Sequence, residues 1–208
     1  MVDLYIHTFY DDMKYWLVNE DGEIHKFEIT TRQISAIFYD EIEALLKKLN
    51  SSYKDIKKIV FINGPGSFTS LRFFLTFAKS LKVSFPEIQV IPLNLLEMMA
   101  FTKDGISDVI MGGSREFLKF FHYGRYEKVV LAPEFRVVED VKLVSYEDAS
   151  KMDKPLFIGV KPDFEVEEYI IKLEDMINFS NYKLASGDVE NIISLTPYYY
   201  KQFVTKKV

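Results

Sequence analysis

The segment that most constrains the fold is residues 58–63, KIVFIN, a short run with four consecutive apolar side chains. A strand with no polar alternation is buried on both faces, as the central strands of parallel sheets are. The next residues, GPGS at 64–67, form a turn, and residues 69–82 then show helical hydrophobic spacing. A buried strand, a tight turn and a helix in this order predict an α/β fold in which helices cover a partly parallel sheet.

The residues around this unit extend it into a series of elements. Three segments, 4–6, 15–18 and 24–29, have the apolar pattern of strands, and the sequence NEDG between the last two is typical of a hairpin turn. Apolar residues recur at helical spacing over 34–49. A strand is predicted at 88–93 and a helix at 95–101. The first half is therefore predicted to contain three strands, a helix, a strand, a helix, a strand and a helix.

A similar order recurs more faintly in the second half. Strands are predicted at 108–111, 117–122, 128–131 and 156–160, and helices near 146–151 and 166–177. This pattern is typical of the α/β actin-like (ASKHA, ribonuclease H-like) fold. That fold has two lobes, and each lobe is a mixed sheet with the element order βββαβα and helices outside. We place an N-terminal lobe at 1–104 and a C-terminal lobe at 105–208, with the hinge at Lys103-Asp104-Gly105.

The composition limits the classes of function. The 208 residues carry a net charge of -5, whereas a protein that binds nucleic acid alone needs a basic surface, so we expect any contact with RNA to come through a partner. The absence of cysteine excludes disulfides, thiolate catalysis and zinc ligation by Cys. Because no segment resembles a signal peptide or approaches the roughly 20 apolar residues of a membrane span, we expect a cytoplasmic protein.

The turn at Gly64, Pro65, Gly66, Ser67 and Thr69 has the residue types of an anion site. Glycines let an anion approach the free amide groups at a helix N-terminus, and Ser67 and Thr69 are placed to cap those amides. We therefore expect a β-branched residue at Gly66 to disrupt the turn, because such a side chain suits neither a positive φ nor the close approach of an anion. Ordinary strand-to-helix turns use the same residues, and the lysine of a Walker motif is missing, so both interpretations stay open.

The segment GPGSFTSLRFFLTFAKSLK, residues 64–82, resembles the GPGSFTGLR signature, with its following A-K-G-L, of the bacterial TsaB (YeaZ) family of tRNA threonylcarbamoyladenosine biosynthesis proteins. The matching positions are Gly64, Pro65, Gly66, Ser67, Phe68, Thr69, Leu71, Arg72, Ala78, Lys79 and Leu81. Residues 52–56, 92–100 and 197–201 also resemble segments of this family. The resemblance therefore covers the first hundred residues well and the rest of the chain thinly.

The resemblance implies the actin-like fold and a noncatalytic role in forming N6-threonylcarbamoyladenosine (t6A) at position 37 of tRNA. The TsaB family is related to the metal-dependent transferase TsaD, which catalyses the reaction. TsaB proteins bind TsaD through helices of their first lobe, and the ATPase TsaE joins this complex. The implied partners are thus a TsaD-type transferase and a TsaE-type ATPase, with tRNA bound only through the complex and no membrane. The resemblance implies that the chain has no cofactor of its own. It leaves open whether a nucleotide binds at the interface of the complex and whether the chain forms a homodimer. It does not support the name glycoprotease that is sometimes given to this superfamily.

The helix at 69–82 has more apolar surface than one buried face requires. Its apolar positions are Leu71, Phe73, Phe74, Leu75, Phe77, Ala78 and Leu81. Large aromatic side chains often anchor interfaces, although a helix between two layers of one domain is buried on several sides just as readily. The resemblance favours an interface, and we assign to it Ile37, Glu41, Ser70, Phe73, Phe74 and Phe77.

Three positions on this helix depart from the family pattern. Ser70, Phe74 and Ser80 stand where the family usually has glycine. Because each added side chain hinders close backbone approach, we expect the surface of the partner to have changed to match.

We predict no catalytic residue and no metal ligands. The three histidines, His7, His25 and His122, are not spaced as a pair on one helix. Most of the family has Asp-Thr at the end of the first strand, where actin-like ATPases hold the water shell of magnesium, but this chain has His7-Thr8. A neutral imidazole is a poor partner for that hard cation, so ATP hydrolysis by the chain alone is not expected.

Two other functions remain open. An actin-fold phosphotransferase or ATPase would act alone and hold a nucleotide phosphate at the turn of residues 64–69. A divergent interaction protein would instead form a homodimer through Phe73 and Phe77.

Overall fold

The computed structural model describes residues 1–9, 12–30, 33–64, 66–101, 107–112, 117–122, 126–132, 156–160, 165–168, 170–187 and 191–197. The chain forms two compact units: Met1–Asn94 with Met176–Tyr199, and Leu95–Asp175 with Tyr200–Val208. This division differs from the expected one at residue 104. The helix at 95–101 packs on the second sheet, whereas Ile192 and Leu195 return to the core of the first unit.

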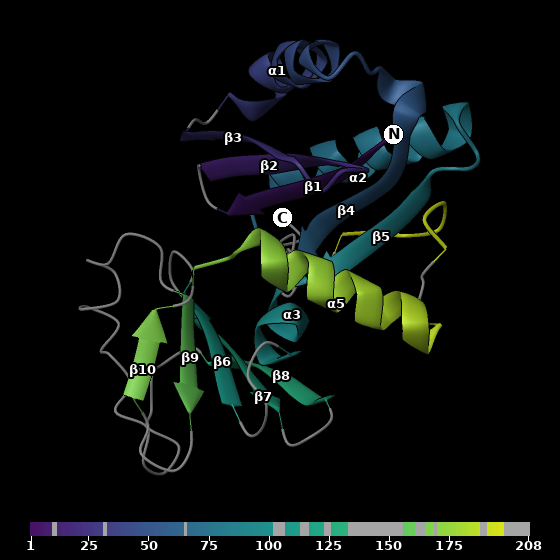
Figure 1. The fold of residues 1–208 in the computed structure, drawn as a ribbon. Coiled ribbons are helices and arrows are strands. Elements are labelled where there is room, and N and C mark those ends of the chain that lie inside the picture. The colour runs from purple at the N-terminus through teal and green to yellow at the C-terminus, as the bar shows by residue number, and fades with distance from the viewer. Residues whose placement is uncertain are drawn as a thin grey trace, which may run out of the picture. The chain divides into compact units, whose positions relative to one another are not determined.

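The first unit is built on a mixed five-stranded sheet. Its strands are β1 (Val2–Phe9), β2 (Asp12–Asn19), β3 (Ile24–Thr30), β4 (Ile56–Gly64) and β5 (Gln89–Asn94), in the order β3-β2-β1-β4-β5 (Figure 1). The first three form an antiparallel meander, and β1, β4 and β5 are parallel. Residues 59–64 of β4 are all buried, which confirms the central strand predicted from its unbroken apolar run.

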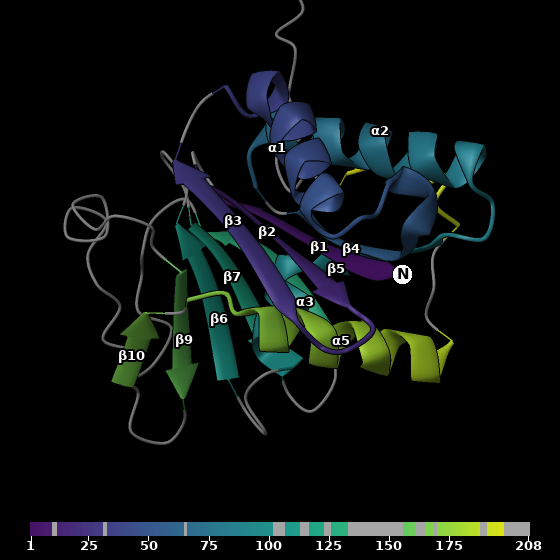
Figure 2. The same ribbon diagram turned by 45° about the horizontal axis from the view of Figure 1, so that its top comes forward.

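Two helices cover one face of this sheet. They are α1 (Ile34–Lys48) and α2 (Phe68–Ser84), which both views place on the same side of the strands (Figures 1 and 2). A short 3-10 helix, η1 (Tyr53–Asp55), joins α1 to β4. Within η1 the Asp55 carboxylate accepts hydrogen bonds from the Ser52 amide and hydroxyl, both at 2.9 Å, and so fixes the entry into the central strand.

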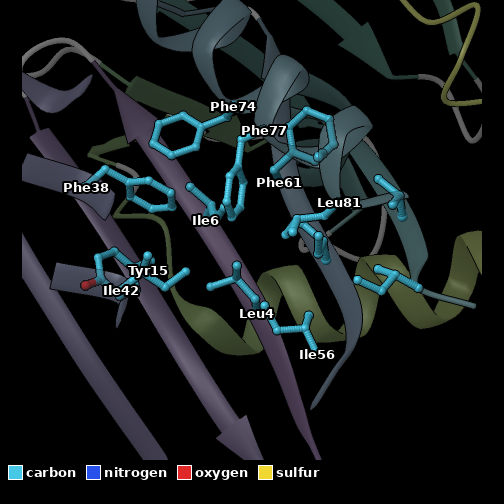
Figure 3. Packing of buried hydrophobic residues seen from close by; sticks show 14 of the residues in the cluster. Leu4, Ile6, Tyr15, Phe38, Ile42, Ile56, Phe61, Phe74, Phe77 and Leu81 are labelled. Carbon is cyan, nitrogen blue, oxygen red and sulfur yellow. The ribbon is translucent and has the colours of Figure 1, made fainter. Parts of the chain in front are cut away.

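A cluster of aromatic rings joins the two helices to the sheet and to each other. Phe38 of α1 is completely buried, and its ring centroid lies 5.0 Å from those of Phe74 and Phe77 and 5.6 Å from that of Phe73. All three contacts are edge-to-face, the favoured arrangement of aromatic pairs. Figure 3 shows the Phe38 ring directed toward Ile6 of β1 and Phe77, with Phe74 beside it. The surplus apolar surface of α2 is therefore covered within the unit by α1.

The second unit begins with α3 (Leu95–Phe101) and contains a second five-stranded sheet. The strands are β6 (Ser107–Gly112), β7 (Phe117–His122), β8 (Tyr126–Ala132), β9 (Leu156–Val160) and β10 (Glu165–Glu168), in the order β10-β9-β6-β7-β8. All four strand pairs described in this sheet are antiparallel. The helix predicted near 146–151 lies outside the part of the chain that the structure describes.

The prediction of a helix at 166–177 places its start too early in the sequence. Residues 165–168 form strand β10 beside β9, and helix α5 extends over Leu173–Ser186. The Asp175 carboxylate accepts a hydrogen bond of 3.2 Å from the Lys172 amide, and Glu174 and Asp175 place negative charge in the first turn. These start signals come after Ile170 and Ile171, whose apolar side chains had suggested a longer helix.

We predict that Phe38→Ala destabilises the first unit by about 3–5 kcal/mol, because it removes the ring against which five other aromatic rings pack. Urea unfolding followed by circular dichroism measures the loss. Tyr39→Ala, at the neighbouring position whose side chain is 46% exposed, is the matched control and should cost far less. Equal losses for the two variants would contradict the central position of Phe38.

Candidate functional site

The carboxyl ends of three parallel strands meet at one edge of the first sheet. β1 ends with His7, Thr8 and a phenylalanine, β4 ends with Asn63 and Gly64, and Gly64 stands opposite Asn94 at the end of β5. His7, Thr8, Asn63 and Asn94 are all at least 95% buried. Because this edge of an open α/β sheet is the common place for ligand and partner sites, the buried polar side chains make it the candidate functional edge.

The turn that follows β4 is strained at its first glycine. Gly64 has a backbone φ angle of 128°, which residues with a Cβ atom rarely adopt. Gly66 does not share this conformation, and a Cβ placed on it would lie 3.6 Å from the Thr8 carbonyl oxygen and 3.6 Å from Leu71 Cδ2, which is ordinary contact. The expectation that Gly66 needs positive φ is therefore corrected: Gly64 carries the strain. Pro65 is not described.

The capping expectation is also corrected. Ser67 occupies the N-cap position of α2, but its side chain makes no capping hydrogen bond. Its backbone carbonyl accepts the first helical bond, from the Leu71 amide at 2.9 Å. Thr69 is the second residue of the helix and is exposed. The turn of residues 64–67 remains a predicted anion site, now without a capping role for Ser67.

We predict that Gly64→Ala destabilises the protein by about 1–3 kcal/mol, since alanine must adopt a rarely populated φ. Gly66→Ala is the matched control, because its Cβ meets only ordinary contacts. Thermal unfolding of both variants measures the difference. The assignment of strain to Gly64 is contradicted if Gly66→Ala costs as much or more.

At the start of α2 an arginine stacks on an aromatic ring. The Arg72 guanidinium carbon lies 3.9 Å from the centroid of the Phe68 ring. Both side chains are exposed, and Phe68 directly follows the signature turn. A guanidinium held over a ring presents a flat cationic surface next to the functional edge.

The residues assigned to a partner interface do not share one environment. Ser70, Phe74 and Phe77 are 5%, 1% and 3% exposed, so they belong to the core of the first unit. Phe73, Ile37 and Glu41 are half-buried. The expectation that Phe77 and Phe74 form an outward surface is corrected, because α1 covers them through Phe38.

The seam between α1 and α2 nevertheless reaches the surface. Tyr39 is 46% exposed, and its ring lies 5.7 Å from Phe73 and 6.0 Å from Phe77. Tyr53 flanks Phe77 at 6.3 Å, and burial, followed by the nearby negative charge of Glu43, raises the pKa of Tyr53 to about 12. At neutral pH the Tyr53 hydroxyl beside the seam is therefore protonated.

The replacements of family-typical glycines affect this seam less than expected. Ser70 and Phe74 point into the core, and only Ser80 is exposed. The larger side chains at 70 and 74 therefore change the packing within the unit, and a partner would meet only Ser80 directly.

A segment distant in sequence is fastened to α2 and β4. The Lys79 ammonium donates to the carbonyl oxygens of Ile193 at 3.0 Å and Leu195 at 2.8 Å, and the Asn63 side-chain amide donates to the Thr196 carbonyl at 3.0 Å. Ile192 and Leu195 are each 6% exposed in the core cluster. We call residues 191–197 the strap. Sequence reasoning missed it, and its only signal was the position of Lys79 within the matched signature.

We predict that Lys79→Met destabilises the first unit by about 1–3 kcal/mol and opens the strap, because methionine keeps the apolar stem and loses both charge-assisted hydrogen bonds. Amide hydrogen exchange of residues 192–196 measures the opening. Lys47→Met, an exposed lysine of α1, serves as control. Unchanged exchange in Lys79→Met would contradict the anchoring role.

The histidines do not assemble a metal centre. His7 is buried at the end of β1. His25 is on the edge strand β3, with its Nε2 atom 3.3 Å from the Glu23 carboxylate, and His122 is in β7 of the second unit. No group of three or more His, Asp or Glu side chains in the described ranges is arranged to hold a metal ion.

Comparison with known proteins decides the family. A family model for TsaD, tRNA N6-adenosine threonylcarbamoyltransferase, matches residues 27–183. The chain belongs to this family. The uncharacterized protein MG208 of Mycoplasma genitalium is 26% identical over 170 residues, which cover 80% of this chain and 75% of that protein. Its homologue in Mycoplasma pneumoniae is 28% identical over 147 residues, covering 66% and 75%.

Solved structures agree on the fold. An uncharacterized Pseudomonas aeruginosa protein with similarity to peptidase YeaZ matches with a TM-score of 0.64 at 16% identity, covering 96% of this chain and 99% of that one. YeaZ from the same organism gives 0.63 at 16% identity, covering 95% and 99%. At this identity the likeness shows the fold, and the expected YeaZ-like, actin-type architecture is confirmed. Among the described residues no helix is long and apolar enough to cross a membrane.

Proposed function

We propose that this protein is a noncatalytic, TsaB-type subunit for t6A modification of tRNA, which binds and supports a TsaD-type transferase together with a TsaE-type ATPase. The observation that carries the proposal is the combination of a TsaD family match over residues 27–183 with a YeaZ fold over nearly the whole chain. The GPGSFT turn supports it, since the turn follows the central strand at the functional edge.

The noncatalytic part of the proposal is supported by the end of β1. His7 stands there, at least nine-tenths buried, in place of the carboxylate that would hold a magnesium water shell. We propose accordingly that the chain has no cofactor of its own and that any nucleotide binds where it meets the transferase. The tRNA would be engaged by the assembled complex.

We place the partner interface on the exposed seam of α1 and α2. A partner can reach Tyr39, Phe73 and the exposed α2 positions Thr69, Thr76 and Ser80, whereas Phe77 lies beneath α1. Neutral aromatic side chains with a polar rim are the usual composition of such interfaces. Phe77→Asp is an unsuitable probe of binding, since a buried charge would disrupt the core.

The test is size-exclusion chromatography with light scattering of this protein mixed with the TsaD-type transferase of the same genome. We expect a heterodimer at micromolar concentration, and we expect Thr76→Arg to weaken it by about 2 kcal/mol or more, because a long charged side chain would intrude into the seam. Asn181→Arg introduces the same side chain at an exposed position of α5 and serves as the control.

Three results would count against the proposal. Separate elution of the two proteins would remove the subunit assignment. A complex that both variants leave intact would move the interface away from the seam. A homodimer that Thr76→Arg abolishes, without any binding of the transferase, would favour a homodimeric interaction protein.

A further inference from the structure

We propose that the outer edge of strand β3 (Ile24–Thr30) pairs with the same strand of a second copy of this chain, which joins two first units through one continuous sheet. The second copy is identified by the backbone and the side chains of β3. The inference therefore does not depend on the proposed function.

Strand β3 lies at the end of the first sheet. In the order β3-β2-β1-β4-β5, only β2 pairs with it among the strands that the structure describes, and Figure 2 shows it as the outermost strand of that sheet. The backbone N–H and C=O groups of an edge strand can pair with another chain. With seven residues, no proline and no bulge against β2, the backbone of β3 has none of the usual features that prevent such pairing.

The pairing of β3 with β2 shows which backbone groups face outward. The Asn19 amide donates to the Glu23 carbonyl at 3.1 Å, so these two residues form a hydrogen-bonded pair of the antiparallel ladder. Hydrogen-bonded and non-hydrogen-bonded pairs alternate along such a ladder. The backbone groups of Ile24, Lys26 and Glu28 therefore point away from β2, and the side chains of all three residues are exposed.

The charges on this edge are complementary to a second copy in one antiparallel register. When Phe27 stands opposite Phe27 of the second copy, each Lys26 stands opposite a Glu28, and the backbone groups of both residues face each other. A hydrogen-bonded antiparallel pair exchanges two N–H···O bonds, so the backbone and the charges select the same register. A slip by two residues would instead place Lys26 opposite Lys26 or Glu28 opposite Glu28, and facing like charges destabilise a strand pair.

The ion pairs within one chain leave this cross-strand contact possible. Lys14 of β2 lies 2.5 Å from the Glu28 carboxylate, and Lys26 forms a second ion pair with it. The side chains of Lys26 and Glu28 are 48% and 42% exposed, so both can reach across the edge. Because Lys14 stays with Glu28, Lys26 can turn to the Glu28 of the second copy without leaving a carboxylate unpaired.

Half-buried apolar side chains lie beside the same edge. Phe27 and Ile29 pack against the core cluster, and the Phe27 ring stacks on Tyr15 with 5.0 Å between the ring centroids. Ile37 of α1 is also half-buried and lies about 200° around the helix from Tyr39, the residue that contacts α2. Pairing of β3 would bring the two Phe27 rings together and add apolar contact to the backbone hydrogen bonds.

The interface is small, so the dimer should be weak. One strand pair buries less than the roughly 1,600 Å² of a standard stable interface, and we expect a dissociation constant of about 10–100 μM. The dimer does not use the seam of α1 and α2, which begins at Tyr39 on the other side of α1. Binding of a transferase to the seam at micromolar concentration is therefore compatible with it.

Sedimentation equilibrium of the full-length protein over a series of concentrations measures the association. In the expected register, Lys26→Glu makes carboxylates face each other and Glu28→Lys makes ammonium groups face each other. Each variant alone should therefore dimerise at least about tenfold more weakly than the wild type. An equimolar mixture of the two variants should recover the association, because every facing pair between the two chains is then of opposite charge.

The matched control is Lys54→Glu, which makes the same charge change at an exposed position of η1 and should leave the association unchanged. Recovery in the mixture also separates a lost contact from a lost fold, since two misfolded variants would not restore each other. The inference is overturned if the wild-type protein stays monomeric at concentrations of about 1 mM, or if the mixture associates no better than the two variants alone.

A different contact between copies would also overturn the inference. A dimer that Thr76→Arg abolishes and that Lys26→Glu leaves intact would lie at the seam of α1 and α2. These measurements contain neither the transferase nor tRNA, so their failure leaves the proposed function standing. Failure of the elution experiment with the transferase likewise leaves the pairing of β3 standing.

Discussion

The packing of Phe38 between α1 and α2 is the interaction on which the rest of the first unit depends. Its buried ring meets Phe73, Phe74 and Phe77 edge-on, which joins the two helices and presses both onto the sheet. That packing holds the start of α2 next to the ends of the parallel strands, where the GPGSFT turn lies. It also leaves an exposed seam through Tyr39, the surface on which we propose that a partner binds.

Helix α2 takes part in two separate sets of contacts that share no residues. One side of α2 packs with α1 and forms the seam, and Lys79 on another side holds the strap through the carbonyls of residues 193 and 195. The first turn carries Phe68 and Arg72 beside the signature turn. The buried His7 at the end of β1 accords with the noncatalytic role that we propose, because a supporting subunit needs a stable docking surface more than reactive groups.

Much of the first unit could be predicted from the sequence because its signals are local. The unbroken apolar run of β4 and the helical spacing of α2 each depend on neighbouring residues. What covers Phe77 could not be predicted, since periodicity shows which side chains share a face but not which element packs there. The strap joins residues more than a hundred positions apart, and the positive φ at Gly64 rather than Gly66 depends on the backbone path. The start of α5 was misplaced because its charged start signals follow apolar residues that fit either structure.

The measurement that tests the central claim most directly is t6A formation on an unmodified tRNA transcript by the TsaD-type and TsaE-type proteins of the same genome, with a threonylcarbamoyl donor, in the presence and absence of this protein. We predict modification that depends on adding this protein and no modification by this protein with the donor alone. Full modification without it, or modification by it alone, would contradict the assignment of a noncatalytic subunit.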